Sequence, residues 1–242
     1  MNMNAGSSKQ TGRKTAIGVG LLYIVGTVAG VLSVVFTGPV LNAADSLMQV
    51  SANRNQIVIG ALFVLLMGFA LAMIPLLMFP ILKKHNEVLA LGYVVFRGAL
   101  EPVTLFATVI GWLLLIPLSQ EYAKAAIPQA PYFQTLSALL RGVGDLPLAV
   151  FVFGLGALIF YSVLYQTKLI PRWISVWGLI AIVLHLTTGF LIMFGLQTGF
   201  DISNSIMNFP IFLQEMVMAV WLIAKGFDPV AIASLSGKAE MD

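Results

Sequence analysis

Six long apolar runs constrain this chain more than any other feature of its sequence. A helix that crosses the hydrocarbon core of a bilayer needs about 20 consecutive, mostly apolar residues. Of the 242 residues, 59% are hydrophobic and only 10% are charged, whereas soluble domains carry about 25% charged residues. We therefore predict an integral membrane protein, an all-α polytopic bundle of six transmembrane helices. The predicted spans are residues 16–36, 56–82, 88–118, 133–165, 173–196 and 207–224.

The segments between these runs are short, which leaves no room for an inserted soluble domain. We assign residues 1–15 to an N-terminal tail, 16–225 to the transmembrane domain and 226–242 to a C-terminal tail. The C-terminal tail is rich in small residues, and we expect it to be disordered. The first apolar run is longer than the core of a signal peptide, which has about 7–15 residues, so we expect it to persist as a membrane anchor.

Lysine and arginine are distributed unevenly among the predicted loops. Short cytoplasmic loops are enriched in these residues. With a cytoplasmic N-terminus, nine of them lie inside, and only Arg54 and Lys124 lie outside. We therefore predict that both termini are cytoplasmic. The nine are Lys9, Arg13, Lys14, Lys83, Lys84, Lys168, Arg172, Lys225 and Lys238.

Six ionisable side chains fall inside the predicted spans. Near the bilayer centre such a group costs at least ~2.5–3.5 kcal/mol, so it should face the interior of the bundle and be paired. We take these six as candidates for binding a ligand or a proton. They are Arg97, Glu101, Arg141, Asp145, His185 and Glu215.

The third and fourth spans repeat a short charged pattern. Arg97 is followed by a glycine and then by Glu101, and Arg141 is followed by a glycine and then by Asp145. In both cases the acid comes four residues after the arginine, which places the two side chains on one helix face. A proline follows each acid and is expected to loosen the helix there.

The rise of 1.5 Å per residue gives each of these side chains an approximate depth. Arg141 and Glu215 fall near the outer third of the bilayer, where we expect them to pair. We expect Asp145 to approach His185 and Glu101 at mid-depth. The arginine of the third span lies below Glu101 and is placed to hold it.

The candidate set carries two arginines and three acids, which leaves one surplus negative charge. An unbalanced buried charge is costly, so a proton, a charged histidine, a bound cation or a bound amine must cancel it. This imbalance favours proton or cation handling. The alternative is a structural network of ion pairs in which one acid stays neutral.

The sequence lacks the residue sets that several other functions require. It contains no cysteine, which excludes disulfides and thiolate metal sites. Its two histidines, His85 in a loop and His185 in a span, cannot form a bis-histidine haem site and supply too few zinc ligands. A glycine-rich phosphate loop is also missing, and the net charge of +3 comes without the basic stripe that nucleic-acid binding needs. We expect no cofactor, no metal and no nucleic-acid partner.

Two segments in the second half of the chain resemble those of a known family. Residues 168–180 read KLIPRWISVWGLI, and residues 207–222 read MNFPIFLQEMVMAVWL. Together with Arg97 and Glu101 they resemble a bacterial multi-pass family, domain of unknown function number 4386, over about residues 16–226. The resemblance implies a protein of the bacterial plasma membrane with about six helices, and it brings no established activity. His185 is not part of the family pattern, so Glu101 and Glu215 become the stronger candidates.

We expect a non-enzymatic protein that contacts the lipid bilayer and binds or transports a small solute, lipid headgroup, cation or proton. In this interpretation Glu101, Asp145 and Glu215 bind the ligand, while Arg97 and Arg141 orient them. The alternative is a structural or assembly protein whose charges only fix the packing of its helices. Intramembrane catalysis is the least favoured class, because no nucleophile lies beside a base in the sequence.

Overall fold

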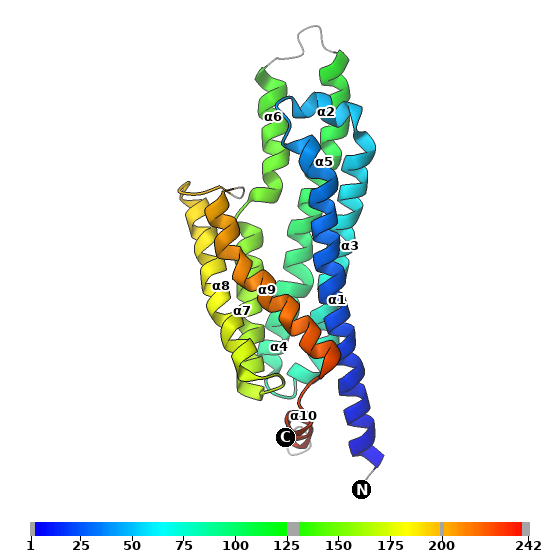
Figure 1. The fold of residues 1–242 in the computed structure, drawn as a ribbon, viewed down its shortest axis with the longest axis vertical. Coiled ribbons are helices and arrows are strands. Elements are labelled where there is room, and N and C mark those ends of the chain that lie inside the picture. The colour runs from blue at the N-terminus through cyan, green and yellow to red at the C-terminus, as the bar shows by residue number, and fades with distance from the viewer. Residues whose placement is uncertain (1–2, 125–130, 199–200, 239–242) are drawn as a thin grey trace.

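The computed structural model describes residues 3–124, 131–198 and 201–238, and every regular element in these ranges is a helix (Figure 1). Two of the elements are short departures from α-helical geometry, the π-helix η1 and the 3₁₀ helix η2. The elements are α1 (Met3–Leu41), α2 (Ser46–Ala52), α3 (Arg54–Leu82), α4 (Glu87–Tyr93), η1 (Val94–Leu100), α5 (Glu101–Lys124), α6 (Pro131–Gly142), η2 (Val143–Asp145), α7 (Leu148–Thr167), α8 (Arg172–Met193), α9 (Ile202–Ala224) and α10 (Pro229–Lys238).

Within the described residues, six helical stretches are long and apolar enough to cross a membrane, which agrees with the predicted number of spans. Many large apolar side chains lie on the outside of the bundle, as expected where helices face lipid; Phe69 and Ile180, for example, are each 60% exposed. The six stretches are Gly12–Leu41, Arg54–Leu82, Glu87–Lys124, Leu148–Thr167, Arg172–Met193 and Ile202–Ala224.

The predicted fourth span, residues 133–165, is wrong at its first half. The chain there forms α6 and η2, is extended at Leu146, and enters α7 only after Pro147. Leu146 has an extended conformation, which suits the residue before a proline, and the helix therefore ends before Pro147. Consequently Arg141 and Asp145 precede the fourth span, Leu148–Thr167, instead of lying inside it.

Glycines allow α1 to pack closely against two neighbouring helices. A Cβ atom on Gly26 would lie 2.9 Å from the side chain of Leu71 in α3, and one on Gly20 would lie 2.7 Å from the carbonyl oxygen of Ala219 in α9. Small residues at such contacts let membrane helices approach. Helix α1 thus packs between α3 and α9, and α9 carries Gln214 and Glu215 toward the centre of the bundle.

The C-terminal segment is ordered over α10, so the expectation of a disordered tail is wrong there. The side chain of Asp228 caps this helix, and Phe227, Ile232 and Leu235 are buried against the bundle. The apolar residues of the segment therefore recur at a helical spacing that its small-residue composition conceals. Helix α10 lies at the same end of the molecule as the start of α1 (Figure 1).

Candidate functional site

A π-helical turn places the first candidate residue, Arg97, inside the bundle. In η1 the N–H of Glu101 donates to the carbonyl of Phe96, five residues earlier. Pro102 follows and has no N–H to offer the carbonyl of Gly98. Single π-turns of this kind often occur at functional sites. Pro102, the proline expected to loosen the helix at Glu101, therefore lies just after the π-helical turn.

Arg97 contacts two glutamates, one on its own helix and one on α9. Its Nη1 donates to Oε1 of Glu101 at 2.7 Å and lies equally close to Oε2, which accepts no hydrogen bond of good geometry. Its Nη2 lies 3.4 Å from Oε1 of Glu215. Arg97 is 1% exposed and Glu101 6%, whereas the Glu215 side chain is 15% exposed. We call Arg97, Glu101 and Glu215 the charged cluster.

Helix α7 fixes the arginine from its other side. The guanidinium carbon of Arg97 lies 4.3 Å from the ring centroid of Phe153, a cation–π contact. One turn along α7, Gly156 leaves room for the aliphatic part of the arginine, because a Cβ there would lie 2.5 Å from Arg97 Cγ. The spacing of three residues puts Phe153 and Gly156 on one face of α7. Both ends of the Arg97 side chain are thus held.

Three buried tyrosines surround the charged cluster, and the sequence analysis did not select them. Tyr23, Tyr93 and Tyr161 are each at most 1% exposed, and all three lie near Arg97 and Glu215. The Tyr93 hydroxyl has no hydrogen-bond partner of good geometry among the described residues. Polar groups inside apolar runs are the signal that could have revealed these residues.

Gln214 links this tyrosine shell to α8. The Tyr161 hydroxyl donates to Gln214 Oε1 at 2.7 Å, and Gln214 Nε2 donates to the carbonyl of Ile174 at 3.1 Å. Gln214 is fully buried and immediately precedes Glu215. The bonds of Gln214 therefore fix the rotation of α9, and with it the position of Glu215.

Arg141 lies apart from the charged cluster, and its predicted pairing with Glu215 is wrong. Its Nη1 donates to the carbonyl of Leu41 at 2.6 Å, and Glu215 contacts Arg97 instead. The break before α7 explains the difference, because it leaves Arg141 on α6. The side chain of Asp145 lies outside the described part of the chain, and so do its predicted contacts with Glu101 and His185.

His185 forms a polar contact of its own. Its Nδ1 lies 2.5 Å from Asn208 Oδ1, and its ring packs edge-on against Phe153, with centroids 4.7 Å apart. Phe153 therefore separates the histidine from Arg97. Within residues 3–124, 131–198 and 201–238 no three histidine, cysteine, aspartate or glutamate side chains gather as metal ligands.

Three of the six predicted residues thus meet, and they retain the predicted imbalance of charge. The charged cluster contains one arginine and two glutamates, all wholly or largely shielded from solvent. With every group ionised it carries one surplus negative charge.

Most of the chain matches the model of one protein family. Residues 19–226 match the model of a family described as Domain of unknown function (DUF4386). The chain belongs to this family. No curated protein and no solved structure matches it. The matched DUF4386 region contains the whole charged cluster and ends before α10 begins.

Proposed function

We propose that this DUF4386 protein is a non-enzymatic protein of the bacterial plasma membrane that takes up a proton or a small cation at Glu215. The surplus negative charge of the charged cluster is the observation that carries the proposal. One proton or one monovalent cation neutralises the cluster, and unbalanced charge at this depth is costly. Both termini of the chain face the cytoplasm in this proposal.

The two glutamates differ in a way that selects Glu215 as the binding group. Glu101 has a 2.7 Å contact with Arg97 and is almost completely enclosed. Glu215 has only a 3.4 Å contact and retains some exposure. A carboxylate that is held weakly and reached more easily exchanges a proton or cation at the lower energetic cost. Arg97 and Glu101 then form the fixed part of the site and Glu215 the variable part.

Infrared difference spectroscopy of the purified protein tests the proposal. In one arm the sample is acidified, and the absorption of protonated carboxyl groups is recorded. In the other arm sodium is exchanged for a bulky organic cation, and the carboxylate absorption is followed. We expect the parent to show, in one of the two arms, a band that is missing from the spectrum of Glu215→Gln. Glu121→Gln should leave it in place, because Glu121 is an exposed residue that pairs with Lys124. Acidification also protonates exposed carboxylates, so only the bands that Glu215→Gln removes are diagnostic. If Glu215→Gln removes no band in either arm, the proposal is overturned.

A structural function is the second candidate, and one observation favours it. The pair of Arg97 and Glu101 is nearly inaccessible and is enclosed by Phe153 and Gly156, which suits a contact that only fixes helix packing. In that case both glutamates contribute to stability and neither exchanges an ion. The stabilities of Glu101→Gln and Glu215→Gln therefore separate the two functions.

A further inference from the structure

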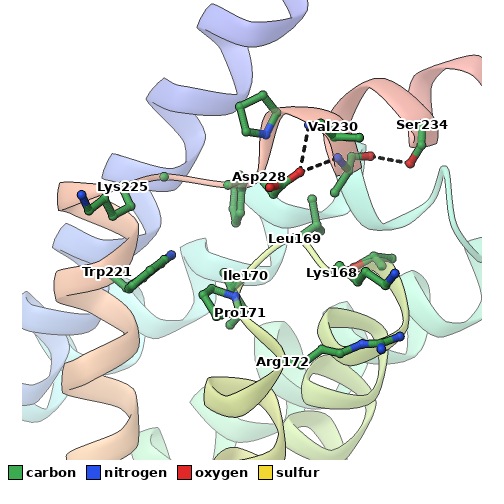
Figure 2. A pocket seen from close by; sticks show the side chains of 15 residues that line it. Lys168, Leu169, Ile170, Pro171, Arg172, Trp221, Lys225, Asp228, Val230 and Ser234 are labelled. Atoms are coloured by element: carbon green, nitrogen blue, oxygen red, sulfur yellow. Dashed lines mark hydrogen bonds between the residues drawn. The ribbon is translucent and has the colours of Figure 1, made fainter.

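A pocket of about 650 Å³ opens at the end of the molecule where α10 and the start of α1 lie (Figure 2). The α7–α8 connection, the last turn of α9 and the first turns of α10 form its walls. The N–H of Asp228 donates to the carbonyl of Leu169 at 2.9 Å, which ties two of these walls together. Lys168 ends α7 in a left-handed conformation, with φ of 58°. The pocket is therefore built by three separate parts of the chain.

The charged residues that line the pocket are mostly basic. Lys168 and Arg172 lie on one side, and Lys225 comes from α9 on the opposite side (Figure 2). The one carboxylate, that of Asp228, accepts hydrogen bonds from two N–H groups in the first turn of α10, both at 2.9 Å. The three cations are exposed. The guanidinium of Arg172 lies 4.9 Å from the ring centroid of Tyr165, so an anion shared with Lys225 must draw it away from that ring. The lining carries a net charge of +2, from three cations and one carboxylate.

An apolar groove continues from this pocket along the lipid-facing side of α9. It has a volume of about 400 Å³ and shares Trp221 and Lys225 with the pocket. Its other residues recur at helical spacing on one face of α9. They are Met216, Val217, Val220 and Ala224. Tryptophan is typical of the level where hydrocarbon meets headgroups, so Trp221 marks the point at which the polar pocket becomes an apolar groove.

We propose that the pocket and the groove together bind one anionic phospholipid. Its phosphate lies among Lys168, Arg172 and Lys225, and one acyl chain lies along α9 beside Trp221. Basic pockets between membrane helices on the cytoplasmic side are suited to anionic headgroups. The charge of the pocket favours an anionic over a zwitterionic lipid. The adjoining groove favours a lipid over a free phosphate ion.

Native mass spectrometry of the delipidated full chain tests this proposal. Phosphatidylglycerol and phosphatidylcholine are added in parallel, and we expect tighter binding of the anionic lipid. The triple variant Lys168→Gln/Arg172→Gln/Lys225→Gln should bind phosphatidylglycerol roughly a hundredfold more weakly. The control Lys14→Gln/Lys83→Gln/Lys84→Gln removes the same charge at the same end of the molecule, together with one hydrogen bond from Lys84 to Ser236 of α10, and should bind like the parent. An equal loss in both triple variants overturns the proposal, because binding then follows surface charge alone.

A second variant tests the groove without touching a charge. Ala224→Phe places a large ring in the groove at an exposed position. We expect it to weaken binding of phosphatidylglycerol and to leave binding of glycerol phosphate, which has no acyl chain, unchanged. Unaltered binding of phosphatidylglycerol overturns the proposal. So does complete displacement of the lipid by inorganic phosphate at equal concentration, since the pocket would then be a site for free anions. The comparison of Ala224→Phe with the parent chain tests the proposal even if the triple variant does not fold.

Discussion

At the scale of single residues, Arg97 is the group on which the centre of the molecule depends. Its charged end contacts Glu101, Glu215 and the ring of Phe153, and its aliphatic part packs against Gly156. A buried charge that loses its partner costs far more than the pair contributes while it is intact. The effect of each substitution on the free energy of unfolding therefore depends on which partners Arg97 retains.

The two glutamates should respond differently to loss of their charge. Glu101→Gln leaves Arg97 with its longer contact alone, and we expect it to lower the free energy of unfolding by about 3–5 kcal/mol. Glu215→Gln removes the surplus charge, and we expect unchanged or increased stability. Thermal unfolding in detergent measures both, with Glu121→Gln as an exposed control. A loss in Glu215→Gln as large as that in Glu101→Gln supports the structural function instead.

Gly156→Ala tests the packing against Arg97 directly. The new methyl group would lie 2.5 Å from Arg97 Cγ, so the arginine or α7 must shift. We expect a loss of about 1–3 kcal/mol, as is typical of overpacking. Gly237→Ala, where no atom lies within 4 Å of the added methyl group, is the matched control and should cost nothing. Equal melting temperatures for the two variants would show that α7 does not confine the arginine.

At the scale of helices, a proline alone does not end a span, since Pro75 and Pro210 lie inside continuous helices. Pro102 lies next to the π-turn and the span continues through it, whereas the chain is extended at Leu146, before Pro147, and a new helix begins at Leu148. The sequence around both prolines is similar, with an arginine, a glycine and an acid before each. The two sites differ in their glycines. Two glycines, Gly142 and Gly144, lie between the arginine and the acid at the second site, and a single glycine, Gly98, at the first, so helical propensity is lower at the second.

The sequence was sufficient to predict the number of spans and the pair of Arg97 and Glu101, because apolar length and the spacing of four residues are local properties. It was not sufficient to predict that Glu215 contacts Arg97 rather than Arg141, since that depends on the rotation of α9. The hydrogen bonds of Gln214 set this rotation, and they join helices far apart in the chain. Contacts between helices were thus the part that local patterns could not supply.

The end of α9 depends on a side chain from α1. The guanidinium of Arg13 donates to the carbonyls of Ile223 at 2.8 Å and Ala224 at 3.3 Å, which have no partners within the helix. We expect Arg13→Gln to let the last turn of α9 open more often. Hydrogen exchange at the N–H groups of Lys225 and Gly226 should become faster, with Lys14→Gln as the control. Exchange that is equally slow in both variants would show that α9 ends stably without the arginine.

At the scale of the whole molecule, the helices differ greatly in length. The stretch Glu87–Lys124 has 38 residues and would extend about 57 Å if straight, almost twice the ~30 Å hydrocarbon core. In Figure 1, α2, α6 and the end of α5 rise above the tops of α7, α8 and α9. We infer that these elements project beyond the bilayer at the end opposite the basic pocket. Arg54 and Lys124, the two basic residues predicted to lie outside, belong to this projecting end.

The absence of cysteine from the sequence makes this orientation directly measurable, because one introduced cysteine reports only its own position. We expect Glu121→Cys to react with a membrane-impermeant maleimide in intact bacterial cells, and Lys83→Cys to react only after the membrane is permeabilised. The reason is the excess of lysine and arginine at the end that contains Lys83. The parent chain is the unlabelled control. The reverse labelling pattern would show that the protein has the opposite orientation in the membrane, with the basic pocket in the outer leaflet. Labelling of both positions from the same side would contradict the third span, which separates them.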